Sequence, residues 1–78
     1  LGHLIQAAGA AGTIVCVQSI RTGWVPPTIN LHHPDPLCDL DHVPNVARDL
    51  NPVGGVKVCL NNSAGFGGQN DTVCVRAV

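Results

Sequence analysis

The sequence predicts an α/β chain in which one buried helix is followed by an extended connector, a long loop and two antiparallel strands. Three observations lead to this prediction: a long apolar run near the N-terminus, a middle rich in proline and glycine, and two segments of alternating apolar residues near the C-terminus. One helix and two strands cannot cover each other's apolar faces. We therefore expect residues 1–78 to be a segment of a larger fold and not an independent domain.

The helix is predicted over residues 3–22, where apolar side chains occupy nearly every face. A helix that is apolar all round must be buried on all sides. The small residues from Ala7 to Gly12 permit close approach of another backbone, which explains glycines that each weaken an isolated helix by about 1 kcal/mol. Arg21 suits the C-terminal end of the helix dipole, and Gly23 suits the left-handed position that closes a helix.

The rest of the chain alternates between irregular and extended segments. Residues 24–31 are predicted as an edge strand or connector, because two consecutive prolines exclude a central strand. Residues 32–55 show no periodicity and predict a long loop of the kind that wraps a larger body. Strands are predicted over residues 56–61 and 72–78, with a glycine-rich turn at 63–71 between them.

Composition narrows the possible functions. Charged residues make up 12% of the chain, its net charge is −1, and no basic run is present, so a nucleic-acid surface is not expected. Protein surfaces usually carry about a quarter charged residues, so we expect much of this surface to be covered by another part of the protein. The longest apolar stretch, residues 7–17, is too short to span a bilayer.

The four cysteines, at positions 16, 38, 59 and 74, have no spacing typical of a zinc site or a Cys-x-x-Cys motif. Cysteines in helical or strand-like runs usually behave as small buried hydrophobes. No signal-peptide pattern is visible. We therefore expect a reduced, cytoplasmic protein and no membrane association.

Two short motifs are candidates for chemistry. Gly2-His3 precedes the apolar helix, and the sequence Asn-Ser-Ala-Gly-Phe-Gly-Gly occupies residues 62–68. Histidine can donate or accept a proton near neutral pH, and a glycine-rich turn can direct backbone N–H groups at an anion. Taken singly, each motif is more often structural, as a packing histidine or as a turn in which glycine supplies positive φ. The order of the two motifs and the sequence between them are more specific than either motif alone.

This text resembles the end of elongating β-ketoacyl-acyl carrier protein synthases of the thiolase superfamily, in the type II fatty-acid or polyketide style. The matching segments are GHLIQAAGAAGTIV, VPPTINL, PDPLCDLDHVPN and NNSAGFGGQND, and the resemblance covers essentially all 78 residues. It implies the C-terminal piece of a thiolase-like fold. It also implies an acyltransferase that performs a decarboxylative Claisen condensation of an acyl thioester with malonyl-acyl carrier protein.

The resemblance further implies roles for individual residues. His3 matches the second histidine of a Cys-His-His set and is expected to donate a hydrogen bond to the malonyl thioester carbonyl. The backbone N–H of Phe66 matches an oxyanion donor, and its ring matches a gate between acyl and malonyl pockets. The substrate-binding residues expected beside it are Ala64, Gly65 and Gly67. The nucleophilic cysteine would precede Leu1, so the chain alone is expected to be inactive.

No cofactor is implied, because the substrates are carried on the phosphopantetheine of acyl carrier protein. The expected partners are the remainder of the ketosynthase, acyl carrier protein, and a second subunit in a homodimer or heterodimer. Three positions depart from the family pattern: Gly12 stands where many members carry Glu, Asn61 where Ser is common, and Ala64 where the turn usually has Phe. The first two departures lead us to expect no metal site, and the third bears on pocket shape.

Two alternatives stay open from the residues alone. The loop at 32–42 holds three histidines, one cysteine and three aspartates, which suggests a small metal-binding module. Zinc needs four ligands that converge on one point, adjacent histidines rarely bind the same ion, and prolines keep this loop extended, so a solvated loop is favoured. The other alternative is a structural or interaction peptide without chemistry.

Overall fold

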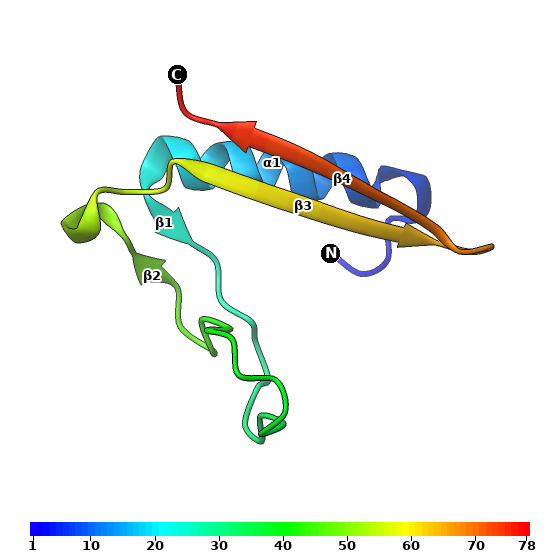
Figure 1. The fold of residues 1–78 in the computed structure, drawn as a ribbon, viewed down its shortest axis with the longest axis horizontal. Helices are drawn as coiled ribbons and strands as arrows, with labels where there is room; N and C mark the ends of the chain where they lie inside the picture. The colour runs from blue at the N-terminus through cyan, green and yellow to red at the C-terminus, as the bar shows by residue number, and fades with distance from the viewer.

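The computed structural model describes all residues from Leu1 to Val78 as a single α-helix and two separate two-stranded antiparallel sheets (Figure 1). The elements in chain order are η1 (Ile5–Ala7), α1 (Ala8–Thr22), β1 (Trp24–Val25), β2 (Arg48–Asp49), η2 (Asn51–Val53), β3 (Val58–Gly65) and β4 (Gln69–Arg76). The predicted α/β composition is therefore confirmed. No helix combines the length and the apolar character that crossing a membrane requires.

Helix α1 begins later than the sequence predicts. A 3-10 turn occupies Ile5–Ala7, and the α-helix starts at Ala8, so the predicted start at residue 3 is wrong. Neither N-cap residue, Leu4 or Ala7, makes a capping hydrogen bond through its side chain, so the usual sequence signal for a helix start is missing. Ile5 has φ +56°, a left-handed conformation, so the α-helix cannot extend back through it.

The C-terminus of α1 is where the sequence predicts it. Gly23 has φ +76° and donates its N–H to the carbonyl of Ser19 at 2.8 Å, which closes the helix in the left-handed manner. The carbonyl of Gly23 accepts the N–H of Leu50 at 2.8 Å. The Asn51 amide donates to the carbonyl of Thr22 at 2.9 Å, so this end of the helix is fastened to the segment after β2.

The long loop contains more structure than predicted. Strands β1 and β2 pair antiparallel, with Trp24 opposite Asp49, and η2 follows at Asn51–Val53. The prediction of irregular structure over residues 32–55 is therefore wrong for its last part. A strand of two residues has no periodicity to detect, and its pairing depends on a partner distant in sequence. The prediction of an edge strand or connector at 24–31 is confirmed by β1.

Strands β3 and β4 form a regular hairpin whose register places Gly65 opposite Gln69, which leaves a three-residue loop at 66–68. Gly67 and Gly68 adopt φ of +83° and +81°, as such a turn requires. The predicted turn at 63–71 is too long, because both strands continue into it. Polar residues sustain the pairing there, and the hydroxyl of Thr72 donates to Asn62 Oδ1 across the strands at 2.7 Å.

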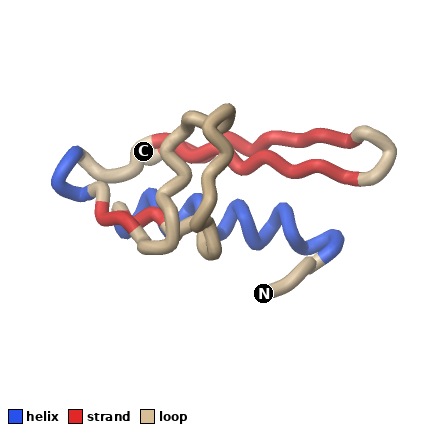
Figure 2. Tube along the Cα trace, turned by 90° about the horizontal axis from the view of Figure 1, so that it is seen from below, coloured by secondary structure: helices blue, strands red, loops and turns tan.

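Helix α1 lies along one face of this hairpin, as Figures 1 and 2 both show. The contact is made by small residues, and the buried residues of the chain are Cys16, Ser19 and Gly23, three of 78. Apolar side chains elsewhere on the helix are open: Ile14 is 61% exposed and Val15 is 44% exposed. The chain therefore does not bury its own helix, and burial of the helix within a larger fold stays a prediction.

Candidate functional site

The start of the helix and the hairpin turn meet at one end of the molecule, because α1 and the hairpin run side by side (Figure 1). An open pocket of about 540 Å³ lies between them. Its lining residues are His3, Ile5, Gln6, Ala64, Gly65, Phe66 and Gln69. Four of the five residues predicted from the two motifs thus surround one space, although more than 60 positions separate His3 from Phe66 in the sequence.

The ring of His3 is oriented by a local hydrogen bond. The backbone N–H of Ile5 donates to His3 Nδ1 at 3.0 Å. A ring nitrogen that accepts a hydrogen bond carries no proton, so the neutral imidazole has its proton on Nε2. His3 can therefore present an Nε2–H donor to a ligand in the pocket. It has no free ring nitrogen that could accept a proton while this bond is made.

The left-handed conformation of Ile5 makes this bond possible. A positive φ is unusual for a β-branched residue and costs free energy, typically about 1–3 kcal/mol. The turn that results places the Ile5 N–H against the ring of a residue only two positions earlier. The strained turn at Ile5 therefore determines the orientation of the His3 ring.

The hairpin turn contributes the other side of the pocket. Phe66 is fully exposed in this chain, and its ring lines the pocket beside Gly65 and Ala64. Gly67 does not line the pocket; it supplies one of the two left-handed residues of the turn. Its predicted contact with substrate stays a prediction.

Two glutamines line this pocket that sequence reasoning passed over. Gln6 is the first polar residue in the mostly apolar sequence that follows His3, and this contrast was the available signal. Gln69 pairs with Gly65 in the hairpin, a position that follows from the register and has no sequence signature. A second pocket of about 440 Å³ continues from the same residues along the interface of α1 and β3 toward Asn61 and Ser63.

The four cysteines are free thiols. Cys16 is buried and its Sγ lies 2.6 Å from Cys59 Sγ. Cys38, in the loop, is exposed, and Cys74, in strand β4, is exposed too, so the expectation of burial for cysteines in strand-like runs fails at Cys74. Burial, and then the contact with Cys16, raise the pKa of Cys59 to about 11. Because a thiolate is the nucleophile and this thiol stays protonated at neutral pH, Cys59 is a poor nucleophile.

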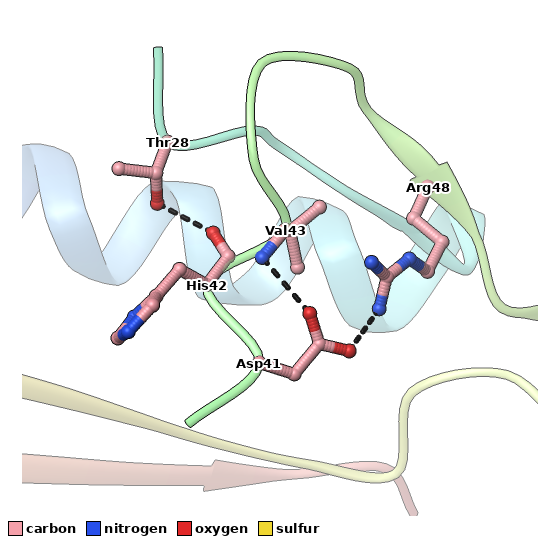
Figure 3. Close-up of polar contacts among 5 residues, drawn as sticks. All are labelled: Thr28, Asp41, His42, Val43 and Arg48. Carbon is pink, nitrogen blue, oxygen red and sulfur yellow. Dashed lines mark hydrogen bonds and ion pairs between the residues drawn. The ribbon is translucent and has the colours of Figure 1, made fainter. Parts of the chain in front are cut away.

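Figure 3 shows three polar contacts in and around the aspartate- and histidine-rich loop. Asp41 forms an ion pair with Arg48, and its other carboxylate oxygen accepts the N–H of Val43 at 3.1 Å. The hydroxyl of Thr28 donates to the carbonyl of His42 at 2.6 Å. The hydrogen bond from Arg48, and then that from Val43, hold the pKa of Asp41 below its ordinary value.

Two further candidate ligands of this loop, His42 and Asp35, also make local contacts with the backbone. The ring Nε2 of His42 lies 3.2 Å from the carbonyl oxygen of Cys38, and Asp35 accepts the N–H of Leu37 at 2.9 Å. No three His, Cys, Asp or Glu side chains gather where they could hold one metal ion. The geometry gives the metal-binding alternative no support.

Comparisons with known proteins define the class to which this site belongs. Residues 1–32 match the family model described as beta-ketoacyl synthase, C-terminal domain. The chain is 47% identical over 77 residues to 3-oxoacyl-[acyl-carrier-protein] synthase 2 of Coxiella burnetii, covering 99% of this chain and 18% of that protein. It is 45% identical over 76 residues to nodulation protein E of Rhizobium sp. (strain N33), covering 97% and 18% respectively.

A third relative comes from polyketide synthesis. The chain is 44% identical over 77 residues to the tetracenomycin polyketide synthase ketoacyl synthase alpha subunit of Streptomyces glaucescens, covering 97% of this chain and 17% of that protein. The chain belongs to the β-ketoacyl synthase family and corresponds to a C-terminal portion of such a synthase. It spans less than a fifth of the length of the relatives named.

Proposed function

We propose that this chain is part of a condensing enzyme, an acyltransferase that joins an acyl thioester to malonyl-acyl carrier protein in fatty-acid or polyketide biosynthesis. The relatives named as 3-oxoacyl-[acyl-carrier-protein] synthase and polyketide ketoacyl synthase support this proposal. The observation that carries it is the single pocket between His3 and the Phe66 turn, with His3 Nδ1 occupied by the Ile5 N–H.

The chemistry fits a donor at this position. Decarboxylation breaks the bond between the malonyl α-carbon and its carboxylate, carbon dioxide leaves, and the electron pair forms an enolate with charge on the thioester oxygen. The Nε2–H of His3 donates to that oxygen as charge develops, and the N–H of Phe66 stabilises the oxyanion formed at the acyl thioester carbonyl. The enolate carbon then attacks that carbonyl, and the cysteine thiolate leaves. None of these steps requires His3 to accept a proton.

The remainder of the synthase supplies what the chain lacks: the nucleophilic cysteine, the first histidine, and the surfaces that complete a thiolase-like fold. Burial of only three of 78 residues supports the proposal that this segment is not an independent domain. The uncovered face of the hairpin also supports it, because Val58 and Leu60 are 58% and 60% exposed there. The proposed partners are acyl carrier protein and a second ketosynthase subunit. The substrates are carried on phosphopantetheine, and the enzyme needs no separate cofactor. Its proposed location is the cytoplasm.

The test uses the complete synthase that contains this chain, with acyl-acyl carrier protein and malonyl-acyl carrier protein labelled at the carboxylate. We expect release of labelled carbon dioxide with formation of a β-ketoacyl product. His3→Ala should lower this rate by about 10²–10³ through loss of one charge-stabilising donor. His33→Ala, in the exposed loop, is the matched control and should retain full activity. A synthase that forms no β-ketoacyl product would contradict the proposal.

A further inference from the structure

One side chain makes the N–H···O hydrogen bonds that join α1 to the hairpin. Asn61 lies on the helix-facing side of β3, half-buried, and its Nδ2 donates to the carbonyl of Gly9 at 2.9 Å. The same nitrogen lies 3.2 Å from the hydroxyl oxygen of Thr13. The other side-chain hydrogen bond between these elements is the thiol pair Cys16 and Cys59, which lies further along the helix from the site.

Gly12 provides the space that the Asn61 amide occupies. A Cβ atom at position 12 would lie 2.6 Å from Asn61 Oδ1 and 2.9 Å from its Nδ2, closer than non-bonded atoms approach. At Gly9 the corresponding atom would lie 3.5 Å from Ser63 Oγ, an ordinary contact. The two helix glycines therefore differ: position 12 must lack a side chain for the Asn61 amide to bond the helix, and position 9 need not.

The contact between Asn61 and α1 lies where it can affect the pocket between His3 and the Phe66 turn. Helix α1 follows His3, and β3 leads directly into Ala64 and Gly65, so each element carries one side of the pocket. Asn61 also lines the adjoining pocket along the interface of α1 and β3. It lies on β3, the strand that leads into the hairpin turn. Few apolar contacts hold this end of the interface, because its helix positions are glycine, alanine and threonine.

We propose that Asn61 is a positioning residue for the condensation step, which fixes the separation between His3 and the Phe66 turn by filling the space over Gly12 and bonding Gly9. This inference rests on the proposed function. Misplacement of reacting groups by about 1 Å can cost up to a hundredfold in rate. Loss of the Asn61 contact therefore lowers the decarboxylation and condensation rate and leaves the loading of the acyl group on the cysteine intact.

The test is a double-mutant cycle in the complete synthase. Asn61→Ser and Gly12→Ala should each lower kcat for condensation about tenfold, with KM for malonyl-acyl carrier protein and the acyl-loading rate changed less than twofold. In Gly12→Ala/Asn61→Ser, a shorter donor leaves space for the new methyl group, and most of the lost kcat should return. Gly9→Ala is the matched control and should stay within about twofold of wild type.

Three results would overturn the inference: equal effects of Gly12→Ala and Gly9→Ala, strictly additive losses in the double variant, or parallel loss of loading and condensation. Thermal unfolding of the same variants separates this inference from the proposed function. If the wild-type synthase did not condense, the proposed function would fail. In that case the melting temperatures would still test the contact between Asn61 and Gly12. Gly12→Ala should lower the melting temperature, and adding Asn61→Ser should restore it.

Discussion

Gly23 is the residue on which the exit from helix α1 depends. Its φ of +76° favours glycine, and a Cβ atom there would lie 2.1 Å from Asn51 Oδ1. We expect Gly23→Ala to destabilise the complete synthase by about 2 kcal/mol or more, because a left-handed alanine costs about 1–2 kcal/mol and the clash with Asn51 adds to it. Urea unfolding of the variant measures this loss.

Gly54→Ala is the matched control for that experiment. Gly54 also has positive φ, +102°, but a Cβ atom there would meet nothing within 4 Å. Gly54→Ala should therefore lower the free energy of unfolding only by the conformational cost of a left-handed alanine. Equal destabilisation by the two substitutions would contradict the argument that Asn51 packs against Gly23.

Single residues differ in how well the sequence predicts them. Gly23 was predictable, because glycine directly after a helical pattern with Arg21 in its last turn is a local signal. The part played by Asn61 was not predictable, because its partner Gly9 lies 52 positions away and the contact exists only once α1 lies on β3. The tautomer of His3 likewise depends on the left-handed turn at Ile5, which isoleucine does not signal.

At the scale of elements, the loop between β1 and β2 depends on the Asp41–Arg48 ion pair and on backbone bonds to Thr28. The pKa of Asp41 is lowered in the folded state, so its contribution to stability is complete above its ordinary pKa of 3.8. The contribution is lost as the pH falls below that value and through the lower folded pKa. Protection of the loop should therefore be constant from about pH 5 upward.

Asp41→Asn reproduces the protonated carboxyl at neutral pH. In the complete synthase, hydrogen exchange should become faster at the amides of Thr28, Val43 and Asn45, whose bonds close the loop. Asp39→Asn is the control, because Asp39 is an exposed aspartate of the same loop. If both variants exchanged at the wild-type rate, the ion pair would not hold the loop closed.

Elements with strong local signals were predicted, and elements that depend on distant pairing were not. The apolar run near the N-terminus predicted α1, and the alternation of apolar residues predicted the centres of β3 and β4. The ends of the two strands next to the turn, residues 62–65 and 69–71, were missed because alternation of apolar residues has stopped there. Strand β2 was missed because two residues carry no period.

For the molecule as a whole, the burial of Cys16, Ser19 and Gly23 alone leaves no apolar core of ordinary size. Folding of an isolated chain has to offset conformational entropy of about 1–2 kcal/mol per residue, which so little burial cannot do. We expect the isolated 78-residue chain to unfold on heating or in urea without a sharp transition. A cooperative two-state melt of the monomer would show that the segment is an independent domain.

The central claim is that His3 acts as a hydrogen-bond donor in decarboxylation and not as a base in acyl loading. The most direct measurement separates the two half-reactions in the complete synthase carrying His3→Ala. Acyl transfer to the cysteine should proceed at nearly the wild-type rate, and decarboxylation of malonyl-acyl carrier protein should fall by about 10²–10³. Loss of acyl loading with decarboxylation preserved would contradict the role that the Ile5–His3 hydrogen bond indicates.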